Sequence, residues 1–279
     1  MTRIAAFHPL SHRLGVTSRR TFLYAVMAAS AVVALLPGRP AHADVLANIQ
    51  KAGVIRVAIP NDFPPFGSLG PDLKLQGYDI DMANLVAKEL GVKAELVPVT
   101  STNRIPFLTT GKVDIVISSL GKNAERAKVI DFTQAYAPFP KSVYGPKDAS
   151  IKKPADLAGK TIGVTRGSTE DLALSAVAPA SATIKRYEDN NATAQSYLIG
   201  QVQLVTVGNI VANAVNERTK LRQLDLKFPV EDTPCYVGVA KGEPALLDKV
   251  NAAITKLKTD GRLNDLSQRW IKMPLPAQL

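Results

Sequence analysis

An alternation of short strands and helices, repeated twice, constrains the fold of this chain more than any other feature. Runs rich in β-branched residues, each about the length of a strand, alternate with segments whose apolar residues recur at helical spacing. In the first repeat the sequence predicts strands at Val54–Pro60, Ala94–Val99 and Val113–Ser118, and a helix at Asp79–Leu90 that stops at Gly91. This alternation indicates an α/β fold, in which helices cover both faces of a sheet.

The alternation restarts after a stretch that carries Pro138, Pro140, Pro146 and Pro154. The sequence predicts strands at Thr161–Thr165, Thr183–Tyr187, Gln203–Val207, Leu221–Leu226 and Tyr236–Ala240, and helices at Thr169–Val177, Asn191–Ile199, Asn209–Glu217, Pro244–Thr259 and Leu263–Trp270. Two such units predict two lobes, with Ala137–Gly145 as a crossing between them. Ligands of these sheets bind beyond the carboxyl ends of the strands, so we expect a site between the lobes.

The first 43 residues have the pattern of a secretory signal peptide that is removed on export. A basic segment precedes an apolar run of 15 residues, Phe22–Leu36, and the small residues Ala41 and Ala43 mark a cleavage site. The pair Arg19-Arg20 is typical of the twin-arginine route, and an ordinary Sec signal is the alternative. The run is shorter than the ~20 residues that span a bilayer. We therefore expect a periplasmic monomer without stable membrane insertion.

The residue inventory excludes several kinds of site. Residues 1–43 hold five of the 34 basic side chains, no acid, and all three histidines, so residues 44–279 carry 29 basic and 24 acidic side chains. No basic stripe with interleaved aromatic residues is left, which argues against nucleic-acid binding. With Cys235 as the one cysteine and no histidine, a Ser-His-Asp triad, a Cys-His pair and a histidine-ligated metal are excluded. We expect no metal and no cofactor.

Five blocks between residues 51 and 272 resemble, in order, the family 3 extracellular solute-binding proteins, which are the polar amino-acid receptors of ABC importers. The blocks are Gly77–Gly91, Gly111–Val116, Glu125–Phe132, Asp156–Thr169 and Pro244–Trp270. The resemblance implies the bilobed periplasmic-binding-protein fold (type II, Venus-flytrap) with two hinge crossings. Lobe 1 would be residues 44–138 plus 232–279, and lobe 2 residues 139–231. The implied partners are a small carboxylate-bearing ligand and a membrane ABC permease.

The resemblance also implies ligand contacts on both lobes. It places the carboxylate-binding arginine at Arg126, with Ser119 and Gly121 beside it on lobe 1 and Ser168 and Thr169 on lobe 2. A guanidinium binds a carboxylate through two charge-assisted hydrogen bonds, so the arginine is chemically suited to this role. Two alternatives stay open. Arg126 would otherwise pair with Glu125 or Asp131 on a solvated face, and Ser168 would otherwise be a plain helix cap.

Three further contacts concern ligand specificity. The resemblance matches Phe63 to an aromatic residue that packs on the ligand, and matches Ser101 and Arg104 to the acidic-amino-acid branch. Core packing for Phe63 and an exposed helix start for Arg104 are the alternatives. Pro60 stands where the cation-binding branch has an acid. These matches rank acidic amino acids and dicarboxylates first, small neutral amino acids or amides second, and cationic amino acids last.

One position departs from the family pattern. Gly208 stands where the family has an aspartate that receives the α-ammonium group of the ligand. Asn209, Asp62 or Glu170 would replace it, or else the ligand has no α-ammonium group. If an acceptor is simply missing, Gly208→Asp should improve the binding of ligands that carry this group.

Three function classes follow from the same residues. The first is a receptor without enzymatic activity, which we expect. The second is an enzyme similar to cyclohexadienyl dehydratases, which place a glutamate where this chain has Val211. The third is a sensory module, which would continue into a membrane segment after Leu279. The absence of a suitable acid at position 211 and of histidine favours the receptor.

Overall fold

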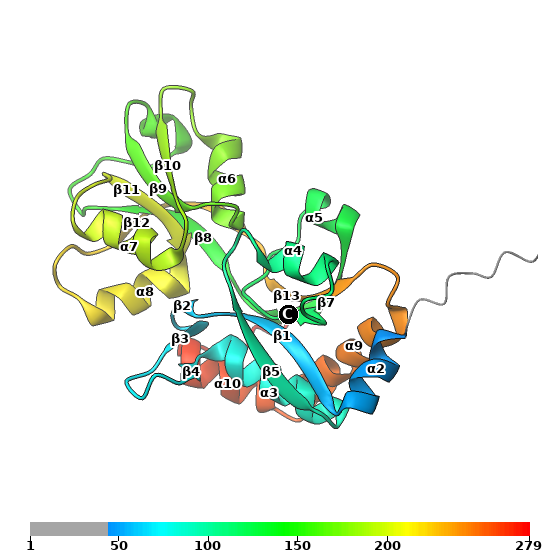
Figure 1. Cartoon of the computed structure of the whole chain (residues 1–279). Helices are drawn as coiled ribbons and strands as arrows, with labels where there is room; N and C mark the ends of the chain where they lie inside the picture. The colour runs from blue at the N-terminus through cyan, green and yellow to red at the C-terminus, as the bar shows by residue number, and fades with distance from the viewer. Residues whose placement is uncertain (1–43) are drawn as a thin grey trace, which may run out of the picture. The chain divides into compact units, whose positions relative to one another are not determined.

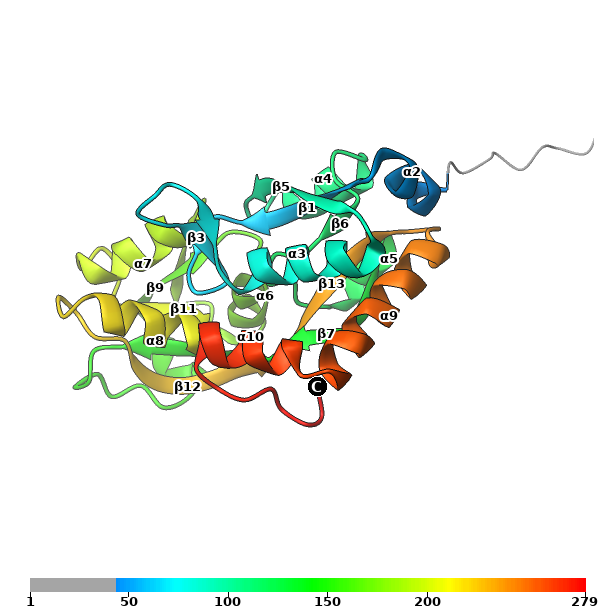
Figure 2. The ribbon, with the colours of Figure 1, turned by 90° about the horizontal axis from the view of Figure 1, so that it is seen from below.

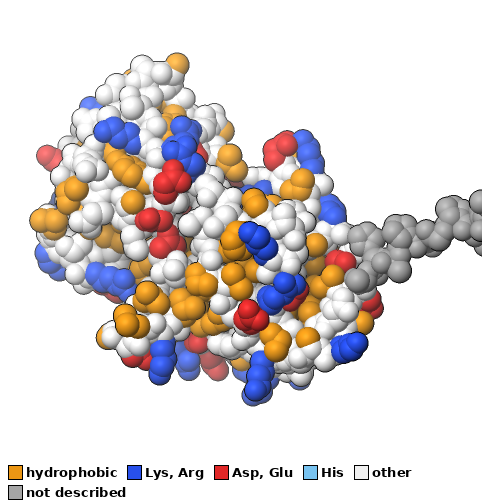
Figure 3. Space-filling model, viewed as in Figure 1, with side chains coloured by type: hydrophobic (Ala, Val, Ile, Leu, Met, Phe, Trp, Pro, Cys, Tyr) orange, Lys and Arg blue, Asp and Glu red, His pale blue; other side chains and the backbone are white. Residues whose placement is uncertain are grey.

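The computed structural model describes residues 44–279, which form one compact unit (Figure 1). The predicted signal peptide, including Arg19 and Arg20, lies outside the described residues. Within residues 44–279, none of the helices combines the length and the apolar character needed to cross a membrane. On the face shown in Figure 3, basic and acidic side chains are interspersed.

The first sheet has five strands in the order β5-β1-β6-β13-β7. Their bounds are Lys93–Val99, Val54–Pro60, Ile115–Val116, Cys235–Ala240 and Ile130–Ala137. Strands β5, β1 and β6 are parallel, whereas β13 runs antiparallel to β6 and β7. Strand β1 is mostly buried, as its sequence, apolar except for Arg56, predicts for a strand covered on both faces.

Helices cover both faces of this sheet. On one face α3 (Tyr78–Leu90), α9 (Pro244–Thr259) and α10 (Arg262–Ile271) pack together over the sheet (Figure 2). On the other face the short helix α4 (Arg104–Thr109) packs against β1, β6 and β13, and α5 (Ala124–Val129) lies against β7. Helix α2 (Val45–Ala52) contacts β1 and α9.

The second sheet has the order β10-β9-β11-β8-β12. Its strands are Thr183–Tyr187, Thr161–Thr165, Leu204–Gly208, Pro140–Gly145 and Asp225–Asp232. Around it lie α6 (Thr169–Val177), α7 (Asn190–Leu198), α8 (Asn209–Arg218) and the 3-10 helix η2 (Pro154–Leu157). A small antiparallel sheet of β2 (Asp62–Phe63), β3 (Gly67–Leu69) and β4 (Leu75–Gln76) follows β1.

The chain passes between the two large sheets twice. Strand β7 ends at Ala137 in the first sheet and β8 begins at Pro140 in the second. The return is equally short, because β12 ends at Asp232 and β13 begins at Cys235. This connectivity confirms the predicted bilobed α/β fold with two crossings.

Most predicted elements are confirmed, and several have the predicted bounds, such as β1, β9, α6 and α9. The predicted strand Val113–Ser118 is shortened to Ile115–Val116. The predicted strand Leu221–Leu226 is wrong in its position, since β12 covers Asp225–Asp232. The side-chain amide of Asn216 binds both the N–H and the C=O of Leu224, which holds the segment before β12 as a loop.

Strand β7 was not predicted, and most of the predicted crossing Ala137–Gly145 is strand β8, so the crossing itself is Pro138 and Phe139. Pro140 is the first residue of β8, where its missing N–H does not interrupt a ladder.

Candidate functional site

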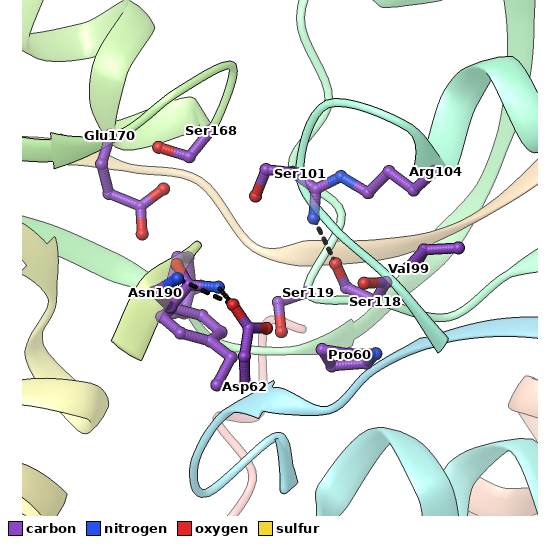
Figure 4. Close-up of a pocket in the computed structure, with 12 residues that line it drawn as sticks. Pro60, Asp62, Val99, Ser101, Arg104, Ser118, Ser119, Ser168, Glu170 and Asn190 are labelled. Carbon is purple, nitrogen blue, oxygen red and sulfur yellow. Dashed lines mark hydrogen bonds between the residues drawn. The ribbon is translucent and has the colours of Figure 1, made fainter. Parts of the chain in front are cut away.

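A small cavity lies between the two sheets (Figure 4). Its volume is about 10 Å³, which is room for about one water molecule. Both lobes and the first crossing contribute to its lining, which consists of Pro60, Asp62, Phe63, Val99, Ser101, Arg104, Ser118, Ser119, Phe139, Ser168, Glu170 and Asn190. Pro60 and Val99 end the parallel strands β1 and β5, so the cavity is at the sheet edge where α/β folds bind ligands.

The structure brings the predicted site residues together. Phe63, Ser101, Arg104, Ser119 and Ser168 line the cavity. The other three predicted residues lie outside the lining but contact one another or neighbouring backbone. Arg126 Nη1 donates a hydrogen bond of 2.7 Å to the carbonyl of Gly121. A side chain at position 121 would come within 2.7 Å of Thr169 Cγ2, so the small residue at 121 lets the second lobe approach.

Arg126 is buried and bridges the two lobes. Helix α5, which starts at the cap Asn123, carries it, and its Nη2 donates a 2.9 Å hydrogen bond to the carbonyl of Gly167 on the second lobe. Glu125 pairs instead with Lys128, and Asp131 pairs with Lys241. The alternative of a surface arginine paired with these two acids is therefore wrong. Burial, together with the nearby charge of Arg104, lowers the pKa of Arg126 to about 9.

Arg104 is a second buried cation, not an exposed helix-start arginine. It is the first residue of α4, 5% exposed, and its Nη1 donates to the carbonyl of Ser118. Its Nε has no hydrogen-bond partner. Burial lowers its pKa, while the nearby carboxylate of Glu170 opposes that change. Two desolvated guanidinium groups at one site favour the arrival of an anion.

Two buried carboxylates face these cations. Asp62 is 9% exposed, and its Oδ2 accepts hydrogen bonds from the backbone N (2.7 Å) and the side-chain Nδ2 (3.0 Å) of Asn190. Its Oδ1 is buried without a partner. Glu170, 5% exposed, accepts a bond of 3.2 Å from the Thr169 hydroxyl. Burial raises the pKa of Asp62, and its bonds to Asn190 oppose that shift.

Gly208 makes room for an aromatic ring. A Cβ at this position would lie 2.4 Å from Phe139, whose ring also packs against Phe63 and Phe66 at centroid distances of 5.9 and 5.3 Å. An aspartate at 208 would overlap this ring. The space next to Gly208 is therefore filled rather than vacant, which argues against the expectation that Gly208→Asp improves ligand binding.

Sequence reasoning missed four lining residues, Val99, Ser118, Phe139 and Asn190. Asn190 is the first residue of α7, whose cap Asp189 was a readable helix-start signal. Phe139 lies in the crossing, for which the sequence carried no comparable signal.

Asp79 positions one wall of the site. It lies in the first turn of α3 and is fully buried. Its Oδ2 accepts bonds from the N (2.7 Å) and the hydroxyl (3.0 Å) of Ser119, and its Oδ1 accepts one of 2.7 Å from the Tyr136 hydroxyl. Ser119 has φ of 44°, a strained conformation for a residue with a side chain. Asp79 thus holds the loop that carries Ser119 to the cavity.

This carboxyl group gives a pH dependence with a definite sign. Burial raises the pKa of Asp79 from 3.8 to about 6, although its three hydrogen bonds oppose the shift. The folded protein therefore binds this proton more tightly than the unfolded chain. The free energy of unfolding should fall by up to about 3 kcal/mol as pH rises from about 4 to 6, and then level off.

Denaturant unfolding of the wild type and Asp79→Asn at several pH values checks this prediction. The stability difference between the two proteins should change over that pH interval and stay constant above it. A difference that is independent of pH would contradict it.

Comparisons with known proteins identify the family of this chain. Residues 55–273 match the model of the bacterial extracellular solute-binding proteins, family 3. The chain is similar to the ABC transporter glutamine-binding protein GlnH of Bacillus subtilis (strain 168), with 31% identity over 82% of this chain and 85% of that one. It is also 31% identical to the L-arginine-binding protein of Pseudomonas aeruginosa, over 77% of this chain and 87% of the relative.

A solved structure extends the similarity to the fold. The crystal structure of the ancestral amino acid-binding protein AncCDT-1, a precursor of cyclohexadienyl dehydratase, superposes with a TM-score of 0.76 at 32% identity. The match covers 81% of this chain and 99% of that one. All three relatives are named as binding proteins. Because the family model spans most of the chain and both lobes, this protein belongs to the family 3 bacterial extracellular solute-binding proteins.

Proposed function

We propose that this protein is the solute receptor of an ABC importer and binds one amino acid in the cavity between its lobes. The observation that carries the proposal is the pairing of buried opposite charges around one small cavity. Arg104 and Arg126 lie on the first lobe, while Glu170 enters from the second. An amino acid supplies both an anionic and a cationic group and can satisfy such a site. The names of the relatives, which bind glutamine, arginine or amino acids in general, support this class of ligand.

The predicted residues have compatible roles in this proposal. Arg126 would exchange the Gly167 carbonyl for the ligand carboxylate, and Arg104 would add its unpaired Nε. The start of α6 would offer the backbone N–H of Thr169 and the hydroxyl of Ser168 to the same anion from the other lobe. Four further residues would complete the contacts: Ser119 and Ser101 with their hydroxyls, Gly121 with its backbone, and Phe63 with its ring.

Binding requires the lobes to separate, because a cavity of about 10 Å³ is smaller than any amino acid. The cross-lobe bonds Arg126–Gly167 and Asp62–Asn190 would break on opening. We propose that residues 44–138 plus 232–279 and residues 139–231 move as the two bodies, with the crossings as the hinge. A permease in the membrane would then recognise the closed, liganded form.

We propose a receptor rather than an enzyme, in spite of the similarity to a dehydratase precursor. The dehydratase-like alternative has no acid at Val211, which is buried at the start of α8. Arg104 and Arg126 would pair with the carboxylate of the ligand and Glu170 with its cationic group, so binding alone explains why these charged side chains are at the cavity.

Export gives a prediction outside the described residues. We expect residues 1–43 to be removed after Ala43 and the protein to reach the periplasm by the twin-arginine route. Replacing Arg19 and Arg20 by lysine should retain the precursor in the cytoplasm, and mass spectrometry of the exported protein should begin at Asp44. Unchanged export of the variant would indicate a Sec signal instead.

A thermal-shift screen of residues 44–279 against the twenty amino acids tests the function itself. A ligand present at 100 times its Kd should add about 2.7 kcal/mol to the free energy of unfolding and raise the Tm. Organic anions without an amino group and cationic polyamines serve as controls. If none of the amino acids raises the Tm, the proposed function is wrong.

A further inference from the structure

Two buried polar atoms at the cavity have no hydrogen-bond partner, and they are of opposite kind. Asp62 Oδ1 is an acceptor and Arg104 Nε is a donor, and both residues line the cavity. Each residue is at least nine-tenths buried. Buried polar groups normally have hydrogen-bond partners. Two unpaired atoms around one cavity therefore indicate a ligand that offers a donor to Asp62 Oδ1 and an acceptor to Arg104 Nε.

We propose that Asp62 Oδ1, together with Glu170, accepts the ammonium group of the ligand, and that the site selects amino acids with an uncharged side chain over dicarboxylates. This inference rests on the proposed function and adds the position of the ammonium group and the charge class of the side chain.

The geometry fixes where a cationic group can go. Both N–H donors of Asn190 hold Asp62 through Oδ2, so the carboxylate is oriented with Oδ1 free. In Figure 4 the Glu170 carboxylate extends from α6 on the same side as Asp62 and Asn190, and Arg104 reaches in from the opposite side. On the α8 side, the Phe139 ring occupies the space next to Gly208. The ammonium group therefore belongs between β2 and α6.

The positive charges around the cavity are matched by at least as many carboxylates before a ligand arrives, since the buried Asp79 also lies behind Ser119. Arg104 and Arg126 carry two positive charges, and Asp62 and Glu170 carry two negative ones. A zwitterion with a neutral side chain keeps this balance, whereas a second ligand carboxylate would lie near two buried acids. The cavity therefore favours small neutral or amide side chains ahead of the acidic ones that the two arginines alone suggest.

The competing role for Asp62 is to hold the two lobes together through its hydrogen bonds with Asn190. Loss of this contact between the lobes would weaken the binding of every ligand by the same factor. Loss of an ammonium acceptor would weaken the binding only of ligands that carry an ammonium group. Calorimetry separates the two roles with Asp62→Asn and Glu170→Gln, and Asp72→Asn on an exposed loop is the matched control. The probes are L-glutamine, L-asparagine and L-serine, each with its 2-hydroxy acid, plus L-glutamate and L-aspartate.

We expect the wild type to bind at least one of the three neutral probes about 10-fold or more tightly than either acidic one. Asp62→Asn should weaken the binding of that probe by about 10- to 100-fold and the binding of its 2-hydroxy acid by less than about 3-fold. Glu170→Gln should reduce the difference in Kd between neutral and acidic probes. Asp72→Asn should leave the Kd of every probe unchanged.

Equal weakening of an amino acid and its hydroxy acid would overturn the proposal, as would tighter binding of an acidic probe by the wild type. Binding of none of the twenty amino acids would overturn the proposed function itself.

Discussion

Arg126→Ala is expected to weaken the binding of the amino-acid ligand at least about 100-fold. The guanidinium is buried and forms no ion pair with the described residues 44–279. It donates two hydrogen bonds to backbone carbonyls, one on each lobe. A ligand carboxylate would replace a neutral carbonyl by a charged acceptor, and each charge-assisted bond is worth about 1.5–3 kcal/mol. Isothermal titration calorimetry at fixed pH and salt measures the loss.

Two control variants make this prediction specific. Arg126→Lys keeps the charge but loses the fork of donors, so we expect an intermediate loss of about 10-fold. Arg166→Ala removes a half-exposed arginine from the pair with Glu188 on the second lobe and should leave the Kd unchanged. A loss of only a few-fold for Arg126→Ala would mean that the carboxylate binds elsewhere.

Lys141→Met is expected to lower the free energy of unfolding by about 2–4 kcal/mol. Lys141 lies at the start of β8 and is fully buried, yet its ammonium group pairs with Glu231 at 3.1 Å and donates to Thr233 beside the second crossing. It also lies 5.2 Å above the Phe139 ring in the first crossing. The ammonium group therefore ties the two crossings together. Methionine keeps the volume but leaves Glu231 and the Thr233 carbonyl without their cation.

Urea unfolding without ligand measures this effect, and Lys256→Met is the matched control. Lys256 pairs with Glu89 on the surface and is 63% exposed, so its loss should cost less than about 1 kcal/mol. Equal stability of the two variants would show that the buried pair at the hinge contributes no more than a surface pair.

The elements that the sequence predicted are those with a local pattern. Strand β1 is apolar except for Arg56, and helix α3 is followed by Gly91, whose φ of 77° suits a glycine. Strand β8 was missed because its position depends on pairing with β11 and β12, which are far away in the sequence.

The same distinction holds for the site. Arg126 and Ser168 lie in sequence blocks that match the family pattern, so both were assigned from the sequence. The contact of Asp62 with Asn190 and the fit of Phe139 against Gly208 join residues that are 128 and 69 positions apart. Such contacts exist only after folding. The sequence therefore showed that an acid was missing at 208, but the structure was needed to show that a ring fills the space.

The receptor function is tested most directly by calorimetric titration of residues 44–279 with the amino acid that gives the largest thermal shift, followed by mass spectrometry of the recovered ligand. A receptor of this kind should show saturable binding of one ligand per chain, lost in Arg126→Ala, and the ligand should be recovered chemically unchanged. Absence of binding for every amino acid, or recovery of a converted product, would contradict it.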